Sequence, residues 1–158
     1  MSTSSSGKPQ LFAEHTTRRD EPAKYKVTSC APLSTRTRLA ARVISIDIWP
    51  DLAAQARRNL TAQGIGNVVI LTGDGTDGAL DFAPFDAIVV CAAYPRVPPP
   101  LAAQLKIGGH LVQPVGPGGA EHVVLYQKER DGLRRVRTVT AASFVRPYGR
   151  HGFPRSEP

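Results

Sequence analysis

Two carboxylates follow short apolar runs of the sequence, where they could bind a polar ligand. Asp47 closes the run Val43–Ile46, and Asp74 lies in the Gly-Asp-Gly turn that follows a second run, Asn67–Leu71. In an open α/β sheet, ligands bind outside the carboxyl ends of the strands. An acidic side chain at such an end can accept hydrogen bonds from two neighbouring hydroxyl groups. The pattern therefore favours a site for a ribose-containing nucleotide, with Asp47 as its first ligand.

Each of these residues also has a simpler interpretation. Asp47 stands three residues before Pro50, so it could merely begin a helix, and Asp74 could merely form its turn. Cys91 ends a third apolar run without an evident base partner, so we expect a packed thiol rather than a nucleophile. The four histidines and two cysteines show no ligand spacing, and we predict no metal site.

The elements around both acids alternate between strand and helix. Val43–Ile46 is apolar and β-branched, as is typical of a buried parallel strand. Pro50 suits a first helical turn and Gly64 suits a stop, so a helix is predicted between them. The other predicted elements are strands at 67–71, 85–91 and 110–115, a short helix at 101–105, and a hairpin of 122–128 with 133–144 around an Asp-Gly turn. This order predicts an α/β fold with a mostly parallel sheet and an antiparallel C-terminal edge hairpin.

The N-terminal part of the chain has a less regular pattern. Residues 1–22 are polar, and we expect a disordered tail there. We expect one domain over residues 23–153 and a short second tail over residues 154–158. Within the domain, Tyr25–Cys30 has modest β character, and Thr35–Arg42 could form a short helix.

Composition narrows the class of protein. The chain has 158 residues, 41% of them hydrophobic, which suits a single domain with a core. No apolar run approaches the roughly 20 residues that cross a membrane, and the Ser-rich start is no secretory signal. The net charge of +7 would permit nucleic-acid binding, but the basic residues form no stripe interleaved with aromatic side chains. We therefore expect a cytoplasmic monomer that binds neither nucleic acid nor membrane, with a solvated basic surface or an attraction for acidic peptides.

From about Leu39 onward, the sequence resembles the protein-L-isoaspartate O-methyltransferases, which are Rossmann-like enzymes that use S-adenosylmethionine. Four blocks carry the resemblance, in the family's order and at similar spacing. They are Val43–Asp47 with the helix as far as Leu60, Asn67–Gly75, Phe85–Gly116 and Phe144–Gly152. An acidic strand end alone is a weak signal, whereas four ordered blocks are fairly specific.

The resemblance implies a function and a set of site residues. The reaction would be methyl transfer from S-adenosylmethionine to the free carboxylate of isoaspartyl residues in damaged proteins or peptides. The implied roles are ribose binding by Asp47, adenine packing by Ile48, acceptance from the adenine amino group by Asp74, close approach at Gly75, and lining of the methyl and substrate site by Ala92 and Ala93. No catalytic residue carries over, because the family's Ser-Gln-Pro-type substrate motif has no counterpart in this chain.

The family's Gly-rich loop after its first strand is also missing. No glycine occurs between Gly7 and Gly64, although close backbone approach to the methionine end of the cofactor needs glycine. We therefore predict a Rossmann-like sheet in which the first strand and Gly-rich loop are missing or replaced, as in an N-terminally truncated or aberrant family member. Tyr25–Cys30 is the predicted substitute strand. Two alternatives remain open: an inactive remnant or binding module, and a methyltransferase that acts on another peptide or a small molecule.

Overall fold

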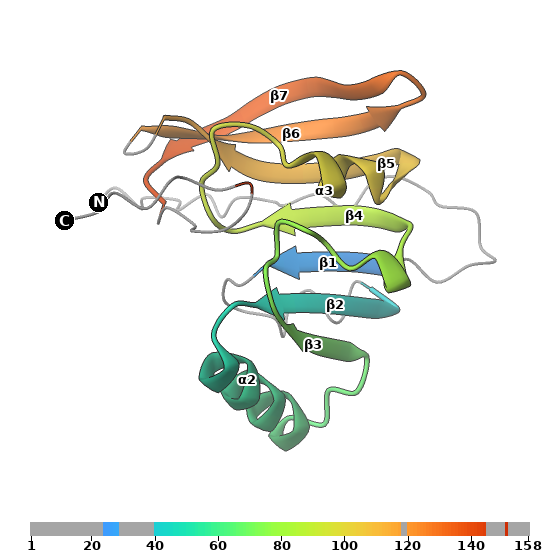
Figure 1. Cartoon of the computed structure of the whole chain (residues 1–158), viewed down its shortest axis with the longest axis vertical. Helices are drawn as coiled ribbons and strands as arrows, with labels where there is room; N and C mark the ends of the chain where they lie inside the picture. The colour runs from blue at the N-terminus through green and yellow to red at the C-terminus, as the bar shows by residue number, and fades with distance from the viewer. Residues whose placement is uncertain (1–23, 29–39, 118–119, 145–150, 152–158) are drawn as a thin grey trace, which may run out of the picture.

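The computed structural model describes residues 24–28, 40–117, 120–144 and 151. Within these residues, the strands form one sheet in the order β3-β2-β1-β4-β5-β6-β7 (Figure 1). The strands are β1 (Lys24–Thr28), β2 (Arg42–Asp47), β3 (Val68–Thr72), β4 (Phe85–Val90), β5 (Leu105–Val115), β6 (Glu121–Glu129) and β7 (Gly132–Ala142). The helices are α2 (Pro50–Ala62), the short 3-10 helix η1 (Leu80–Phe82) and α3 (Pro99–Ala103). The predicted tails lie outside the described residues.

The sheet is built around β1, which pairs in parallel with β2 on one side and β4 on the other. Tyr25 lies opposite Val43 in β2 and opposite Ala87 in β4. The prediction that Tyr25–Cys30 takes the place of the first strand is confirmed as far as Thr28, and the following two residues lie outside the described part. The parallel core with an antiparallel β5–β6–β7 edge also confirms the predicted Rossmann-like α/β class.

Helix α2 covers the sheet beside β2 and β3 (Figure 1). It begins at Pro50, which suits the first helical turn because proline has no N–H to leave unpaired. Ala53 and Leu60 are buried and pack in one cluster with Ile70 of β3. The guanidinium of Arg57 donates to the Ile70 carbonyl at 2.9 Å, which secures the helix to β3. The helix thus holds the chain that leaves Asp47 against the sheet.

The main core lies on one face of the parallel strands. Ile44, Ile88 and Leu111 come from β2, β4 and β5, are at most 1% exposed, and share one cluster with Phe85. Alternate side chains of a strand point to the same face of the sheet, and those on the covered face are removed from water. Burial of the apolar side chains in this cluster therefore supplies much of the hydrophobic stabilisation. It also fixes the positions of the strand ends that follow it.

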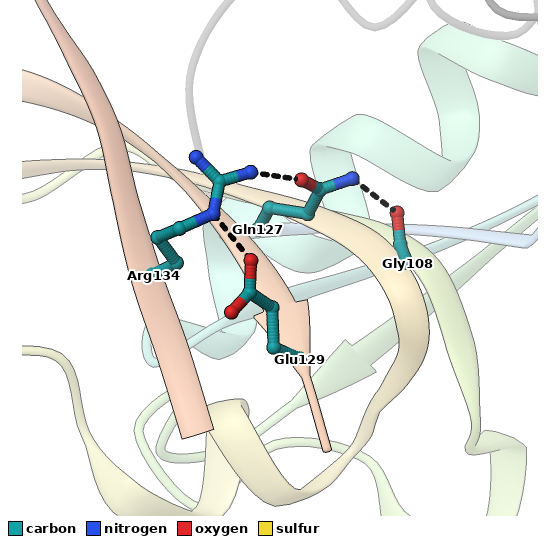
Figure 2. Close-up of polar contacts among 4 residues, drawn as sticks. All are labelled: Gly108, Gln127, Glu129 and Arg134. Carbon is teal, nitrogen blue, oxygen red and sulfur yellow. Dashed lines mark hydrogen bonds and ion pairs between the residues drawn. The ribbon is translucent and has the colours of Figure 1, made fainter. Parts of the chain in front are cut away.

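The C-terminal hairpin carries a polar network that joins it to β5 (Figure 2). Arg134 of β7 forms an ion pair with Glu129 and donates to the side-chain oxygen of Gln127 at 2.6 Å. The amide of Gln127 in turn donates to the carbonyl of Gly108 at 3.5 Å. Arg134, one of the basic residues expected at a solvated surface, therefore has its charge engaged within the hairpin.

The predicted helix over Thr35–Arg42 is wrong where it can be tested. Ala40 and Ala41 are not helical, and Arg42 begins β2. The side-chain amide of Asn67 donates to the Ala40 carbonyl at 2.8 Å, and the Val43 amide donates to the Asn67 carbonyl at 2.9 Å. These contacts with the approach to β3 favour an extended chain, so tertiary pairing overrides the local helix propensity of Ala and Arg.

Strand β5 begins earlier than the predicted 110–115. Its first residue, Leu105, pairs with Phe85, and the register then shifts before His110 pairs with Ala87. Gly108 in this irregular stretch has a φ of +82°, which favours glycine. The sequence pattern missed the stretch because its polar and glycine residues break the apolar alternation that marks a strand.

We expect Leu111→Ala to destabilise the fold by about 2–5 kcal/mol, because it leaves a cavity in the main core. The matched control is Leu80→Ala, since Leu80 is 75% exposed, and its expected effect is under about 0.5 kcal/mol. Urea unfolding followed by circular dichroism measures both. Equal free energies of unfolding for the two variants would contradict the assignment of the core.

Candidate functional site

The two predicted acids lie at neighbouring strand ends on one edge of the sheet. Asp47 is the last residue of β2 and pairs with Thr72, the last residue of β3. The Gly73 amide donates to the Asp47 carbonyl at 3.0 Å, so the turn that carries Asp74 starts directly beside Asp47. The structure therefore brings together the residues that the sequence suggested as a pair.

The Asp47 side chain is half-buried and held by the backbone that follows it. Its Oδ1 accepts a hydrogen bond from the Trp49 amide at 2.9 Å. This contact supports the chain entering α2, so the simpler interpretation of Asp47 as a helix-start carboxylate describes part of what it does. A carboxylate offers about four acceptor positions, and the Trp49 amide takes one of them. Asp47 thus retains the capacity to accept from a ligand diol.

Asp74 forms the turn predicted by the simpler interpretation as well. Its Oδ1 accepts from the Thr76 amide at 2.8 Å, a side-chain-to-backbone bond typical of Asp in turns. Asp74 and Gly75 are both half-buried, whereas Thr76 is 1% exposed. The bond sets the direction of the carboxylate, so turn formation and ligand binding are compatible at Asp74.

An apolar surface adjoins Asp47. Ile48, predicted to pack beside a base, is 51% exposed, and Trp49 is 65% exposed. Leu52, one helical turn beyond Ile48, is 50% exposed. The sequence analysis missed the last two, although three large apolar side chains around an acidic strand end were a readable signal. Such a surface can cover the flat face of a base.

The predicted alanines follow β4 and differ in exposure. Ala92 is half-buried, and Ala93 is fully buried. Tyr94 comes next and is only 3% exposed, with its backbone joined to the end of β5 through Val115. Burial, and secondarily the charge of Asp74, raise the pKa of Tyr94 to about 12. The sequence predicted a loop at Tyr94, because its bridge to Val115 depends on a contact between segments that are distant in the chain.

Other candidate groups contribute nothing to this edge. In the described part of the chain, no three His, Cys, Asp or Glu side chains are grouped to hold a metal. Cys91 is a buried cysteine outside any disulfide, in keeping with the packed role expected for it. The same part contains no helix that is long and apolar enough to span a membrane.

Two hollows lie away from the acidic edge. One, of about 100 Å³, is lined by Arg42, Asp81 and their neighbours near the start of β2. The other, of about 510 Å³, is a wide depression between the η1 segment and α3, with Pro84 and Pro100 in its wall. Neither is lined by Asp47 or Asp74. The strand-end chemistry, and not the shape of these hollows, therefore identifies the candidate site.

Comparison with known proteins agrees with this geometry. Residues 27–151 match the family model for protein-L-isoaspartate(D-aspartate) O-methyltransferase. The chain belongs to this family. The match begins within β1, upstream of the Leu39 start of the resemblance, and lies inside the predicted domain over residues 23–153.

Curated relatives bear the name protein-L-isoaspartate O-methyltransferase. The protein from Methanoculleus marisnigri is 44% identical over 115 residues, which are 73% of this chain and 52% of the relative. One from Archaeoglobus fulgidus is 45% identical over 111 residues, which are 70% of this chain and 50% of the relative. The chain thus spans about half the length of the curated relatives that it matches.

Solved structures of the same family share the fold. One protein-L-isoaspartate O-methyltransferase superposes with a TM-score of 0.71 at 24% identity, covering 84% of this chain and 44% of that one. A candidate member from Plasmodium falciparum, in complex with S-adenosyl-L-homocysteine, superposes with a TM-score of 0.59 at 18% identity. That alignment covers 77% of this chain and 65% of the other. At these identities the likeness establishes the fold.

We expect Tyr94 to ionise only near pH 12, at a higher pH than a tyrosine whose pKa has the ordinary value of 10.0. Because the folded pKa is raised, the stability that this phenol contributes is fully present below pH 10 and is lost as the pH rises through about 12. A tyrosinate absorbance titration should show a late step that Tyr94→Phe removes. An unchanged late step in Tyr94→Phe would contradict the assignment.

Proposed function

We propose that this chain binds S-adenosylmethionine at its acidic edge and serves the methylation of isoaspartyl carboxylates in damaged proteins. Membership of the family supports the reaction class. The observation that carries the proposal is the junction of the two acidic strand ends, where the Gly73 amide donates to the Asp47 carbonyl at 3.0 Å. It joins the backbones of two acidic strand ends at the carboxyl edge, where α/β sheets bind nucleotides, and this supports a role for both acids.

The residues at this edge fit the adenosyl part of the cofactor. The half-buried Asp47 would accept from the ribose hydroxyls, and the exposed Ile48 would cover one face of the adenine. Asp74 would accept from the adenine amino group, and Gly75 would let the base approach the backbone. Asp47 and Asp74 would keep their bonds to the Trp49 and Thr76 amides while a ligand binds, because a carboxylate offers about four acceptor positions.

The reaction requires mainly that the methyl donor and the substrate carboxylate be positioned relative to each other. When bound, S-adenosylmethionine supplies a sulfonium-activated methyl group to an oxygen of the substrate carboxylate. That carboxylate is already a nucleophile, so the protein needs to align the two reactants rather than remove a proton. The half-buried Ala92, directly beyond β4, would line the floor of this region, and the fully buried Ala93 would support it from behind. No general acid or base is assigned.

The proposed partners are proteins or peptides that contain isoaspartyl residues. We propose that the chain acts on them as a monomer in the cytoplasm, without nucleic acid or membrane. Engagement of Arg134 by Glu129 and Gln127 lowers the charge that the hairpin can offer to nucleic acid.

We expect Asp47→Asn to weaken binding of S-adenosylmethionine by about 10- to 100-fold, because hydrogen bonds to a charged acceptor are lost. The asparagine oxygen can still accept from the Trp49 amide, so the start of α2 should be preserved. Titration calorimetry measures the affinity. The matched control is Asp81→Asn, an exposed carboxylate in η1, which should bind like the unaltered chain.

Two results would count against the site in different ways. Absence of binding by the unaltered chain would reject the cofactor. Binding that Asp47→Asn leaves as tight as Asp81→Asn would retain the cofactor and reject the role of Asp47.

We also expect a peptide that contains an isoaspartyl residue to take up labelled methyl, whereas its aspartyl isomer does not. The isomers differ in where the free carboxylate lies, so a positioned methyl donor distinguishes them. Counting methyl incorporation into the paired peptides measures this. Cofactor binding without transfer to either peptide would favour a binding module over an enzyme, and transfer to both would favour a different substrate class.

A further inference from the structure

The chain that follows β4 is folded back onto the carboxyl end of β5 (Figure 1). The Tyr94 amide donates to the Pro114 carbonyl at 3.1 Å, and the Gly116 amide donates to the Tyr94 carbonyl at 3.1 Å. Two residues after Tyr94, the Arg96 carbonyl accepts from the side-chain amide of Gln113 at 3.2 Å. All three bonds reach one short stretch at the end of β5. The backbone of Arg96 is therefore held at the same edge of the sheet as the end of β4.

Gln113 is a polar residue in an apolar part of β5. It is fully buried and follows Leu111 by two positions, so both side chains point to the same face of the strand. Its Nε2 donates to Arg96, whereas its Oε1 has no hydrogen-bond partner in the described part of the chain. A buried acceptor without a partner destabilises a fold, and an apolar side chain of similar size would avoid this. The bond to Arg96 is therefore what an apolar side chain could not replace.

The side chain of Arg96, unlike its backbone, is exposed. Among the residues that the structure describes, no carboxylate pairs with its guanidinium, whereas Arg134 is paired with Glu129. Prolines stand one residue before Arg96 and two residues after it, and the fixed φ of proline restricts the backbone on both sides. Arg96 thus combines a fixed backbone with an exposed positive charge.

The substrate of the proposed reaction brings a negative charge to this edge of the sheet. An isoaspartyl residue carries a free carboxylate, and the site residues assigned above include no cation to receive it. Arg96 follows the half-buried Ala92 by four residues, along a segment that folds back onto β5. A guanidinium matches the geometry of a carboxylate with parallel N–H donors. One carboxylate oxygen could accept from Arg96 while the other stays free to receive the methyl group.

We propose that Arg96 is a specificity-determining residue that binds the free carboxylate of an isoaspartyl peptide, and that Gln113 is its positioning residue. This role deepens the proposed function and rests on it. Arg96 contacts the substrate, whereas Gln113 acts only through the backbone of Arg96. Loss of the guanidinium would remove the attraction for the carboxylate and leave the cofactor site unchanged.

The test measures the binding of two peptides to the chain saturated with S-adenosylhomocysteine. One peptide contains an isoaspartyl residue, and the other carries an amide in place of its free carboxylate. We expect Arg96→Gln to weaken binding of the first about 3- to 10-fold, between the effects of an exposed ion pair and of a hydrogen bond to a charged group. Binding of the amide peptide should change by less than about 2-fold, because a neutral group forms no ion pair. Titration calorimetry gives the ratio of the two affinities, which a merely structural effect would leave unchanged.

Arg130→Gln is the matched control, because it removes the same charge from the opposite edge of the sheet. Arg130 is exposed and follows the end of β6, which runs antiparallel to β5. This variant should leave the affinity ratio unchanged. Gln113→Leu should lower the ratio in the same direction as Arg96→Gln, and it should cause no further change in an Arg96→Gln background, because the two residues act on one contact.

The outcomes separate this role from the proposed function. If the unaltered chain does not bind S-adenosylhomocysteine, the proposed function falls, and this role falls with it. If that ligand binds but the two peptides bind equally or not at all, or if Arg96→Gln weakens both alike, Arg96 does not recognise the carboxylate and the cofactor site stands. A ratio that Gln113→Leu leaves unchanged would reject the positioning role of Gln113. Arg96→Met, which also lacks the charge, provides the same test if the glutamine variant does not fold.

Discussion

The parallel pairing of β1 on both of its edges is the constraint on which the rest of the structure depends. Without it, β2 and β4 would each present an unpaired apolar edge, and such edges promote aggregation. With it, the carboxyl ends of β2 and β4 are brought to the same side of the sheet. The two acidic strand ends meet through the pairing of β2 with β3, and β1 places the alanines that follow β4 at the same edge of the sheet.

At the acidic edge, local structure and ligand chemistry use the same atoms. Asp47 and Asp74 each accept from the backbone amide two residues further on, at 2.9 and 2.8 Å. Each bond restricts the rotation of a carboxylate that would otherwise lose this freedom when a ligand binds. Such preorganisation lowers the cost of binding. The simpler interpretations of these residues therefore describe how the functional ones are achieved.

The loop after Asp74 is anchored by a buried side-chain amide, that of Gln104 at the end of α3. Gln104 accepts from the Ala79 amide and donates to the Asp77 carbonyl, both at 2.8 Å. Gly78 lies between these contacts, with a φ of +81°, and a Cβ there would meet the Gln104 amide oxygen at 2.1 Å. Glycine is thus needed both for the backbone angle and for the space. Gln104 is the C-cap of the short helix α3, so the end of this helix is joined to the loop that follows the acidic turn.

Several features of the fold and the site were readable from the sequence alone. The apolar runs before Asp47 and Asp74, the proline that opens α2 and the Asp-Gly hairpin turn are local signals, and local signals predict local structure. The order of the four family blocks then gave the fold class and the family. Even the pairing of the two acids followed from the rule that parallel strand ends share an edge.

The tertiary structure decided what depends on contacts between distant residues. The non-helical chain at Ala40–Arg42, within the helix predicted over Thr35–Arg42, follows from the pairing of Arg42 with β1 and from the bond of Asn67 to Ala40. The modest β character of Tyr25–Cys30 made it only a candidate for the first strand, and the parallel pairing with β2 and β4 decided the matter for Lys24–Thr28. The burial of Tyr94 was equally hidden, since it arises from packing between segments that are distant in the sequence, including the bridge of Tyr94 to Val115. Sequence determined which residues could act at the edge, and strand pairing determined which of them meet.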